Sequence, residues 1–154
     1  MFQNLLSRHF CSSAVRRMSK VMREVINTDY APKPIGPYSH AVRIGQTLYV
    51  SGQVGSDPRT SSLVSGGIAA ETRQALTNIG KILEAAGTNF KNVAKCTVLL
   101  ADMNDFPEMN KVYAEFFPEQ PPARAAFQVV RLPKDALVEI EAIAVVDAQI
   151  GSSL

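Results

Sequence analysis

The segment from residue 122 to residue 146, PARAAFQVVRLPKDALVEIEAIAVV, constrains the fold of this chain more than any other. Two apolar runs rich in β-branched residues flank a short polar loop with a proline, a pattern that predicts a β-hairpin. Successive side chains of a strand point to opposite faces. One face of the predicted hairpin is therefore apolar, and the other carries Arg124, Glu139 and Glu141 among small or apolar neighbours.

Arg124 has two interpretations. A single charge on a strand is most often a solvated side chain. However, Ala126 leaves open space beside Arg124, and a guanidinium group matches a carboxylate with two parallel hydrogen bonds. With a second carboxylate nearby, such a site would hold a small anionic acid and aim a water molecule at it.

The register of the predicted hairpin separates the two charges. If Val130 pairs with Leu137, then Arg124 lies four residues beyond the partner of Glu139, roughly 13 Å away at the rise of a strand. We therefore expect Arg124 and Glu139 to share a ligand only if another chain brings them together.

The rest of the chain predicts an α+β fold. Strands are expected at 21–26, 38–44, 47–55 and 92–102 before the two hairpin strands, with helices at 68–86, ending before Gly87, and after Asn104 as N-cap. The second helix buries an apolar face made of Phe106, Met109, Val112, Tyr113, Phe116 and Phe117. The order strand-strand-strand-helix-strand-helix-strand-strand gives a sheet of about six strands with both helices on one face. The strands carry apolar residues on both of their faces, so the sheet face without helices should also be covered. We therefore expect an oligomer whose subunits pack through their sheets.

Several residues outside the predicted hairpin are candidate site residues because of their position in the chain. Three prolines and a glycine precede Tyr38, which forces an extended or turning path there. Ser51 and Gly52 end a strand, where a glycine marks a bulge or turn, or permits close approach to a ligand. Asn110 is a polar exception on the buried face of the second helix and is either a satisfied amide or part of a site.

Composition limits the functional classes. The 154 residues fit one domain, and no apolar run approaches the ~20 residues of a membrane span. The two cysteines and two histidines form no metal-ligand cluster, and a reducing compartment fits the cysteine usage. The net charge of +2 conceals a body with 11 basic against 14 acidic residues beyond residue 23, so a basic nucleic-acid-binding face is not favoured.

The first 19 residues differ from the remainder. They contain Arg, Ser and apolar residues but no acid, which is typical of a mitochondrial transit segment. Met18 offers an alternative start site, in which case the upstream stretch is an N-terminal extension. We expect a single domain at 20–150, a tail at 151–154, and a location in the mitochondrial matrix, the cytoplasm or both.

Five segments carry a resemblance to a known family: APKPIGPYSHAV, LYVSGQVG, NIGKILEAAG, MNDFPEMNKVYAEFF and PARAAFQVVRLPKDALVEIEAIA. In this order and spacing, along about 120 residues, they resemble the Rid/YjgF reactive-intermediate imine deaminases. This family is also called the perchloric-acid-soluble or L-PSP translation-inhibitor proteins. The last segment is very specific for this family.

The resemblance implies a chorismate-mutase-like fold, a homotrimer with clefts between subunits, and hydrolysis of 2-imino acids made by pyridoxal-phosphate enzymes, without a cofactor or metal. Carried onto this chain, Arg124 binds the substrate carboxylate, Glu139 activates water, and Tyr38 orients that water or donates a proton. The pocket is completed by Ser51, Gly52, Asn110 and Ala126, the last at a position where many bacterial members have a cysteine.

Two other classes of function stay open. The family has also been described as endoribonucleases that inhibit translation, for which this chain offers only His9 and His40 as imidazole acid–base groups. A non-catalytic, chaperone-like or binding role would use the oligomer surface instead. It predicts an activity that survives changes at both Arg124 and Glu139.

Overall fold

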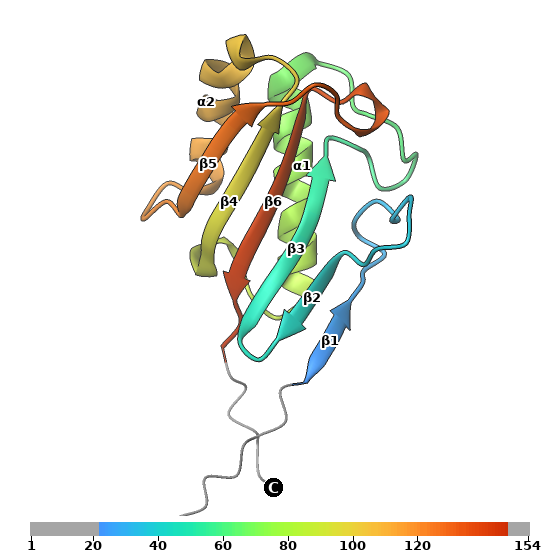
Figure 1. Ribbon diagram of the computed structural model, residues 1–154, viewed down its shortest axis with the longest axis vertical. Coiled ribbons are helices and arrows are strands. Elements are labelled where there is room, and N and C mark those ends of the chain that lie inside the picture. Colours follow the sequence, from blue (N-terminus) through green and yellow to red (C-terminus); the bar gives the residue numbers. More distant parts are fainter. Residues whose placement is uncertain (1–21, 148–154) are drawn as a thin grey trace, which may run out of the picture.

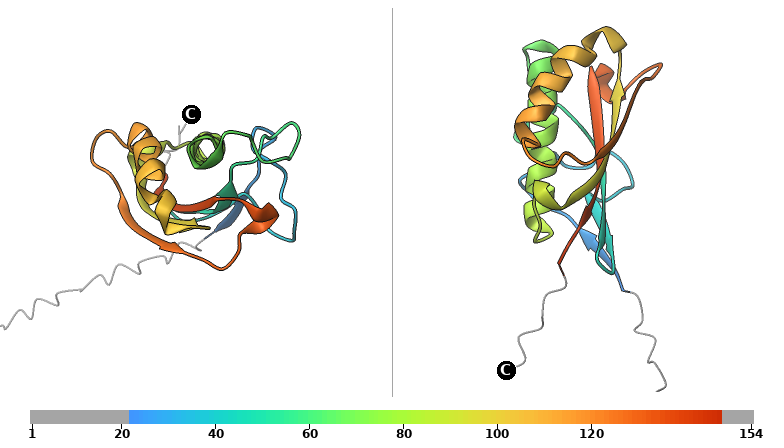
Figure 2. Two further views of the ribbon diagram at one scale, coloured as in Figure 1. Left: turned by 90° about the horizontal axis from the view of Figure 1, so that it is seen from above. Right: turned by 90° about the vertical axis from the view of Figure 1, so that its left-hand side faces the viewer.

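The computed structural model describes residues 22–147, which form one mixed β-sheet with two long helices on one of its faces (Figures 1 and 2). The strands are β1 (Arg23–Ile26), β2 (Ala41–Ile44), β3 (Thr47–Val54), β4 (Val93–Leu100), β5 (Ala123–Gln128) and β6 (Val138–Val145). The helices are α1 (Gly67–Ala85) and α2 (Phe106–Phe116), with short 3-10 turns at Phe90–Asn92, Met103–Asp105 and Pro133–Asp135. The predicted element order, the six strands and the one-sided helical layer are confirmed. The predicted transit segment and the 151–154 tail lie outside the described residues.

The hairpin prediction is wrong. The strand order is β1-β2-β3-β6-β4-β5, so β4 lies between the two strands that were expected to pair. β5 runs parallel to β4, a pairing that needs a crossover connection, and α2 supplies it. The connection from β5 to β6 is not a tight polar turn, because Leu132 and Ala136 within it are buried.

Helix α1 forms as its sequence predicts. Its apolar positions recur at helical spacing, and it packs against β3 and β6. The chain leaves the helix at Gly87, whose φ of +76° is readily adopted only by glycine.

The start of α2 differs from the prediction that Asn104 caps it. Asn104 lies within the preceding 3-10 turn, where its main-chain N–H donates to the Asp102 side chain at 2.9 Å. Helix α2 begins at Phe106 with Pro107 in its first turn, where a missing N–H donor has no cost. The capping residue is therefore Asp102, two residues before Asn104, and it caps the 3-10 turn and not helix α2.

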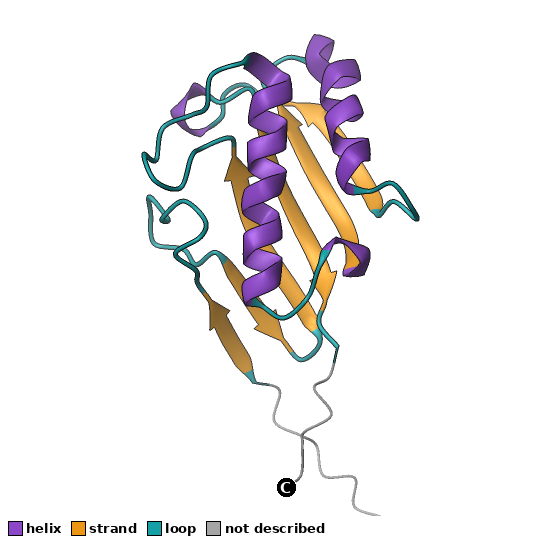
Figure 3. Cartoon of the chain, turned by 180° about the vertical axis from the view of Figure 1, so that it is seen from behind, coloured by secondary structure: helices purple, strands orange, loops and turns teal. Residues whose placement is uncertain are grey.

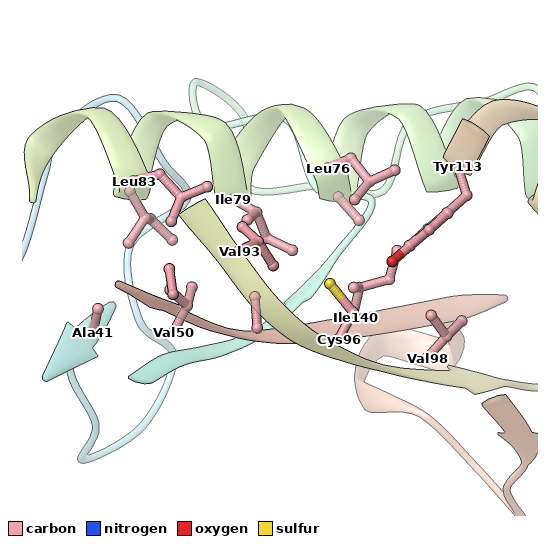
Figure 4. Packing of buried hydrophobic residues seen from close by; sticks show 14 of the residues in the cluster. Ala41, Val50, Leu76, Ile79, Leu83, Val93, Cys96, Val98, Tyr113 and Ile140 are labelled. Atoms are coloured by element: carbon pink, nitrogen blue, oxygen red, sulfur yellow. The ribbon is translucent and has the colours of Figure 1, made fainter. Parts of the chain in front are cut away.

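The core lies between the sheet and the helices (Figures 3 and 4). Leu76, Ile79 and Leu83 of α1 point toward the sheet, and Val98 and Ile140 of the sheet belong to the same buried cluster. These side chains are at most 1% exposed. Neither α1 nor α2, the two long helices among residues 22–147, is long and apolar enough to cross a membrane.

The opposite sheet face carries no helix from the described part of the chain (Figure 2). By register, the side chains of Ile44, Tyr49, Phe127 and Val145 lie on this face, and each is 42–48% exposed. An apolar sheet face of this kind favours association with another copy. The homotrimer stays a prediction.

Candidate functional site

A bulge in β3 creates a pocket on the open face of the sheet. The β3–β6 register shifts between Val50 and Gln53, so that Ser51 and Gly52 together oppose the single residue Glu141. The side chain of Glu139 lies directly over Gly52, since a Cβ on that glycine would sit 1.9 Å from Glu139 Oε1. The glycine therefore makes room for the glutamate carboxylate rather than for a ligand alone.

Tyr38 and Ser51 flank this carboxylate. Ser51 is fixed by two hydrogen bonds, its Oγ donating to Ser39 O at 2.7 Å and its N–H donating to His40 O at 2.9 Å. Tyr38 is 46% exposed, and its hydroxyl accepts a long hydrogen bond of 3.4 Å from the main chain of Ile35. The resulting pocket of about 400 Å³ is lined by Tyr38, Ser51, Gly52, Glu139, Glu141 and Lys134, among others. We refer to it below as the carboxylate pocket.

The environment of Glu139 favours its protonated form. The side chain is partly buried, and burial is the main cause that raises the pKa of its carboxyl group, followed by repulsion from Glu141. None of the five ion pairs among residues 22–147 involves Glu139. A carboxylate with a raised pKa and no cationic partner is suited to accept a proton from water.

Arg124 lies elsewhere, on the helical face of the edge strand β5. By register it stands beside Cys96, whose side chain is buried in the core. Its guanidinium group lies 4.5 Å from the ring centroid of Tyr113 and 5.5 Å from that of Phe106, both cation–π distances. Asn110, one turn before Tyr113 on α2, lines the same groove. We refer to this second site as the arginine groove.

Aromatic stacking holds the guanidinium group while leaving its donors free. Arg124 takes part in none of the ion pairs found in the described part of the chain. The Tyr113 ring lies under the guanidinium group, and its hydroxyl points toward Cys96 (Figure 4). Burial raises the pKa of Tyr113 further above its ordinary value. The arrangement leaves the five N–H donors of Arg124 available for an anion.

The two sites lie on opposite faces of the sheet. β4 separates β5 from β6, and Arg124 and Glu139 are aligned with Cys96 and Leu99 of β4, three residues apart. Strand spacing and rise place their Cα atoms about 14 Å apart. The expectation that both charges share one face is wrong, because it depended on the hairpin. Their separation within one chain nevertheless agrees with the prediction.

The remaining predicted residues divide between the sites. Tyr38, Ser51, Gly52 and Glu139 gather in the carboxylate pocket, and Asn110 joins Arg124. Ala126 packs against the core and is not among the residues that line the arginine groove. The sequence interpretation missed Lys134, which lines the carboxylate pocket in a left-handed conformation with φ +61° that no pattern predicts. It also assigned Phe106 and Tyr113 only to the core, because their helical spacing alone does not show the arginine above them.

Among residues 22–147, no group of three or more His, Cys, Asp or Glu side chains is arranged to hold a metal ion.

These features define a class of small α+β proteins with an arginine-lined groove and a carboxylate pocket on the two faces of one sheet. The chain belongs to the family described as Endoribonuclease L-PSP, whose sequence model matches residues 28–146. It is 59% identical over 128 residues to a 2-iminobutanoate/2-iminopropanoate deaminase of Bos taurus, covering 83% of this chain and 93% of that protein.

Solved structures share the fold. RidA from an Antarctic Psychrobacter is 46% identical with a TM-score of 0.77, and the match covers 80% of this chain and 99% of that one. TdcF of Escherichia coli, solved with bound serine, is 39% identical with a TM-score of 0.77 and the same coverage.

Proposed function

We propose that this protein is a 2-imino acid deaminase, which hydrolyses 2-iminobutanoate and 2-iminopropanoate to the 2-oxo acids and ammonia. Its similarity to the bovine deaminase motivates the substrate class. The observation that carries the proposal is the Glu139 carboxylate, seated over Gly52 with a raised pKa and no cationic partner in the described chain. The relative solved with serine is in keeping with a ligand of the size of a small amino acid.

Arg124 binds the carboxylate group of the substrate in this mechanism. Its unpaired fork gives two parallel charge-assisted hydrogen bonds, and the Tyr113 ring holds the fork in place. Asn110 supplies a further polar contact from the same groove. Two bonds from one planar group fix the orientation of the substrate, which brings its C=N carbon to a defined position.

Glu139 supplies the base. It removes a proton from a water molecule as the water oxygen attacks the imine carbon, and the imine nitrogen gains a proton. Glu139 then gives the proton that it took from water to the amino nitrogen, and the carbinolamine hydroxyl loses its own proton, which replaces the one given to the imine nitrogen. The C–N bond breaks, which releases ammonia and leaves the 2-oxo acid. Tyr38, exposed at the pocket, orients the water or donates the proton to nitrogen. The substrate side chain, a methyl or ethyl group, needs only a small space.

The site is composite in our proposal. Within one chain the arginine groove and the carboxylate pocket face away from each other, so one substrate reaches both only across an interface between copies. β5, which carries Arg124, is an edge strand of the sheet, and the open face that carries Glu139 is apolar. A homotrimer in which β5 of one subunit meets the open face of the next would create three such sites.

Endoribonuclease activity ranks second. Its acid–base chemistry usually uses exposed imidazoles, but His40, the only histidine in residues 22–147, is 2% exposed and has both ring nitrogens in contact with the main chain. A binding or chaperone-like role predicts that neither Arg124 nor Glu139 matters. Arg124→Ala separates all three: it should abolish imine hydrolysis, whereas RNA cleavage that persists would belong to another site.

The proposed activity is tested by generating 2-iminobutanoate in place. A threonine dehydratase releases the imine, and the purified protein should accelerate the appearance of 2-oxobutanoate. In the presence of semicarbazide, it should also suppress the trapped imine adduct. The proposal is wrong if pure oligomer gives no acceleration over the uncatalysed hydrolysis.

Gly52→Ala is expected to remove activity while leaving the fold intact. The new Cβ would lie 1.9 Å from Oε1, at the end of a flexible side chain that can rotate away and take the base out of position. We expect kcat to fall at least about tenfold, since misplacement of about 1 Å has large effects on catalysis. Steady-state kinetics and the Tm measure the two effects separately.

Gly55→Ala is the matched control for Gly52→Ala. Here the Cβ would lie 2.5 Å from the main-chain Cα of Glu71, which cannot rotate away. The free energy of unfolding should fall by about 1–3 kcal/mol, as in other overpacked sites. Equal losses of stability in the two variants would contradict the assignment of Gly52 to the site.

The pH dependence should respond to Glu141. The base must be ionised to act, so kcat/KM falls as pH drops through the pKa of Glu139, which Glu141 helps to raise. Replacing Glu141 with glutamine removes that repulsion and should move the acid limb of the kcat/KM profile to lower pH. A limb that stays in place or moves to higher pH would show that another group controls it.

A further inference from the structure

His40 connects the two segments that build the carboxylate pocket. Its side chain is 2% exposed. Ring Nδ1 accepts a hydrogen bond from Thr28 N at 3.2 Å, and ring Nε2 donates to Pro32 O at 2.8 Å. Because a main-chain N–H can only donate and a carbonyl can only accept, both contacts are satisfied only by the neutral tautomer with its proton on Nε2.

The main chain of His40 makes two further contacts. Its N–H donates to Asn27 Oδ1 at 3.1 Å, and its carbonyl accepts from Ser51 N at 2.9 Å. One residue therefore holds the start and middle of the 27–38 loop on one side and strand β3 on the other.

The 27–38 loop has few other means of fixing its shape. Pro32, Pro34 and Pro37 lack an N–H donor. The one main-chain hydrogen bond found within the loop joins Tyr38 N to Gly36 O at 2.9 Å. The two hydrogen bonds from the His40 side chain to the loop backbone take the place of main-chain hydrogen bonds that the loop lacks.

The held segments are the ones that face the pocket. Pro32 and Ile35 of the loop line the pocket with Tyr38, and Ser51 lines it from β3. Tyr38 stands two residues before His40, so a shift of the His40 ring displaces the tyrosine hydroxyl and the pocket wall together.

We infer that the His40 side chain positions the proposed deaminase site, and that it acts by fixing Tyr38 through the 27–38 loop. The inference rests on the proposed function. It assigns His40 no contact with substrate and no proton transfer. Its effect should therefore appear in the chemical step and should depend on Tyr38.

A double-mutant cycle tests this role. His40→Leu keeps the bulk of the side chain but removes both ring hydrogen bonds, and we expect kcat to fall about 10- to 100-fold. KM should change less than about threefold, because the carboxylate clamp belongs to Arg124. In a Tyr38→Phe background, the same change should lower kcat less than about threefold further, since the group being positioned is already absent.

Two further variants separate positioning from general loss of stability. In His40→Gln, a side-chain amide can still donate to Pro32 O, so kcat should recover to within about fivefold of the wild-type value. Thr88→Val removes a partly buried hydrogen bond of 2.7 Å from Thr88 Oγ1 to Val145 O, at the end of β6 away from Glu139. It should lower the Tm without lowering kcat measured below that Tm.

The outcomes are distinct. An equal loss of kcat from His40→Leu with and without Tyr38→Phe would overturn the inference, as would Thr88→Val losing as much kcat as His40→Leu. If the wild-type protein does not hydrolyse imines, the proposed function fails first. Amide hydrogen exchange then tests His40 alone: faster exchange at Thr28, whose N–H donates to the ring, in His40→Leu supports its hold on the loop, and unchanged exchange there overturns it.

Discussion

Replacing Arg124 with alanine should lower kcat/KM for 2-iminobutanoate by at least about 100-fold. Truncating one partner of a hydrogen-bonded charge pair costs about 2–5 kcal/mol, and 2.7 kcal/mol corresponds to about two powers of ten. The fold should persist, because Arg124 has no ion pair within residues 22–147 and only stacks on Tyr113 and Phe106. The coupled dehydratase assay and a thermal melt measure the two effects.

Two control variants sharpen this result. Arg124→Lys keeps the charge but not the fork, so most of the loss should remain. Arg73→Ala removes another exposed arginine, whose bidentate pair with Glu115 joins α1 to α2, and should leave kcat/KM unchanged. Full activity in Arg124→Ala would show that the substrate carboxylate binds elsewhere.

Replacing Glu139 with glutamine should lower kcat about 10²- to 10⁴-fold, the usual contribution of a general base. KM should change little, since Arg124 still binds the substrate. Glutamine is nearly isosteric and fits the space over Gly52. Steady-state kinetics at pH 7 give both constants.

The same variant should be at least as stable as the wild-type protein. Folding raises the pKa of Glu139, so the folded state binds the proton more tightly than the unfolded state. Stability is then lost as pH rises through the raised pKa, and removing the ionisable group removes that loss. A Glu84→Gln variant, at an exposed position on α1, is the matched control and should change neither kcat nor Tm. A large fall in the Tm of Glu139→Gln would show that Glu139 stabilises the fold, which would contradict its assignment as the base.

Local patterns sufficed to predict the helices and most strands. Helix α1 has a continuous apolar stripe and a glycine at its end, so its limits could be placed within one residue. The partners of the strands could not be derived in the same way. An apolar strand such as β6 has the same alternation whether its neighbour is β5 or β4, because pairing depends on contacts far apart in the sequence.

The face of Arg124 was hidden for a related reason. In β5, no residue is fully buried, so its exposure lacks the alternation that reveals a core face. The bulge that Gly52 allowed as one interpretation is present, whereas only the structure shows that the Glu139 side chain lies over this glycine. The prediction that Arg124 and Glu139 do not meet within one chain agrees with the structure for a different reason: β4 and the thickness of the sheet separate them.

Mixing two inactive variants tests the composite site most directly. Arg124→Ala and Glu139→Gln subunits are unfolded together in equal amounts, refolded and assayed for 2-iminobutanoate hydrolysis. If each site takes its arginine from one subunit and its glutamate from the next, random assembly gives about a quarter of the sites an intact pair, whatever the size of the ring. We expect the mixture to recover about a quarter of wild-type activity, and each variant refolded alone to stay inactive. Mixed oligomers with no more activity than the separate variants would contradict it.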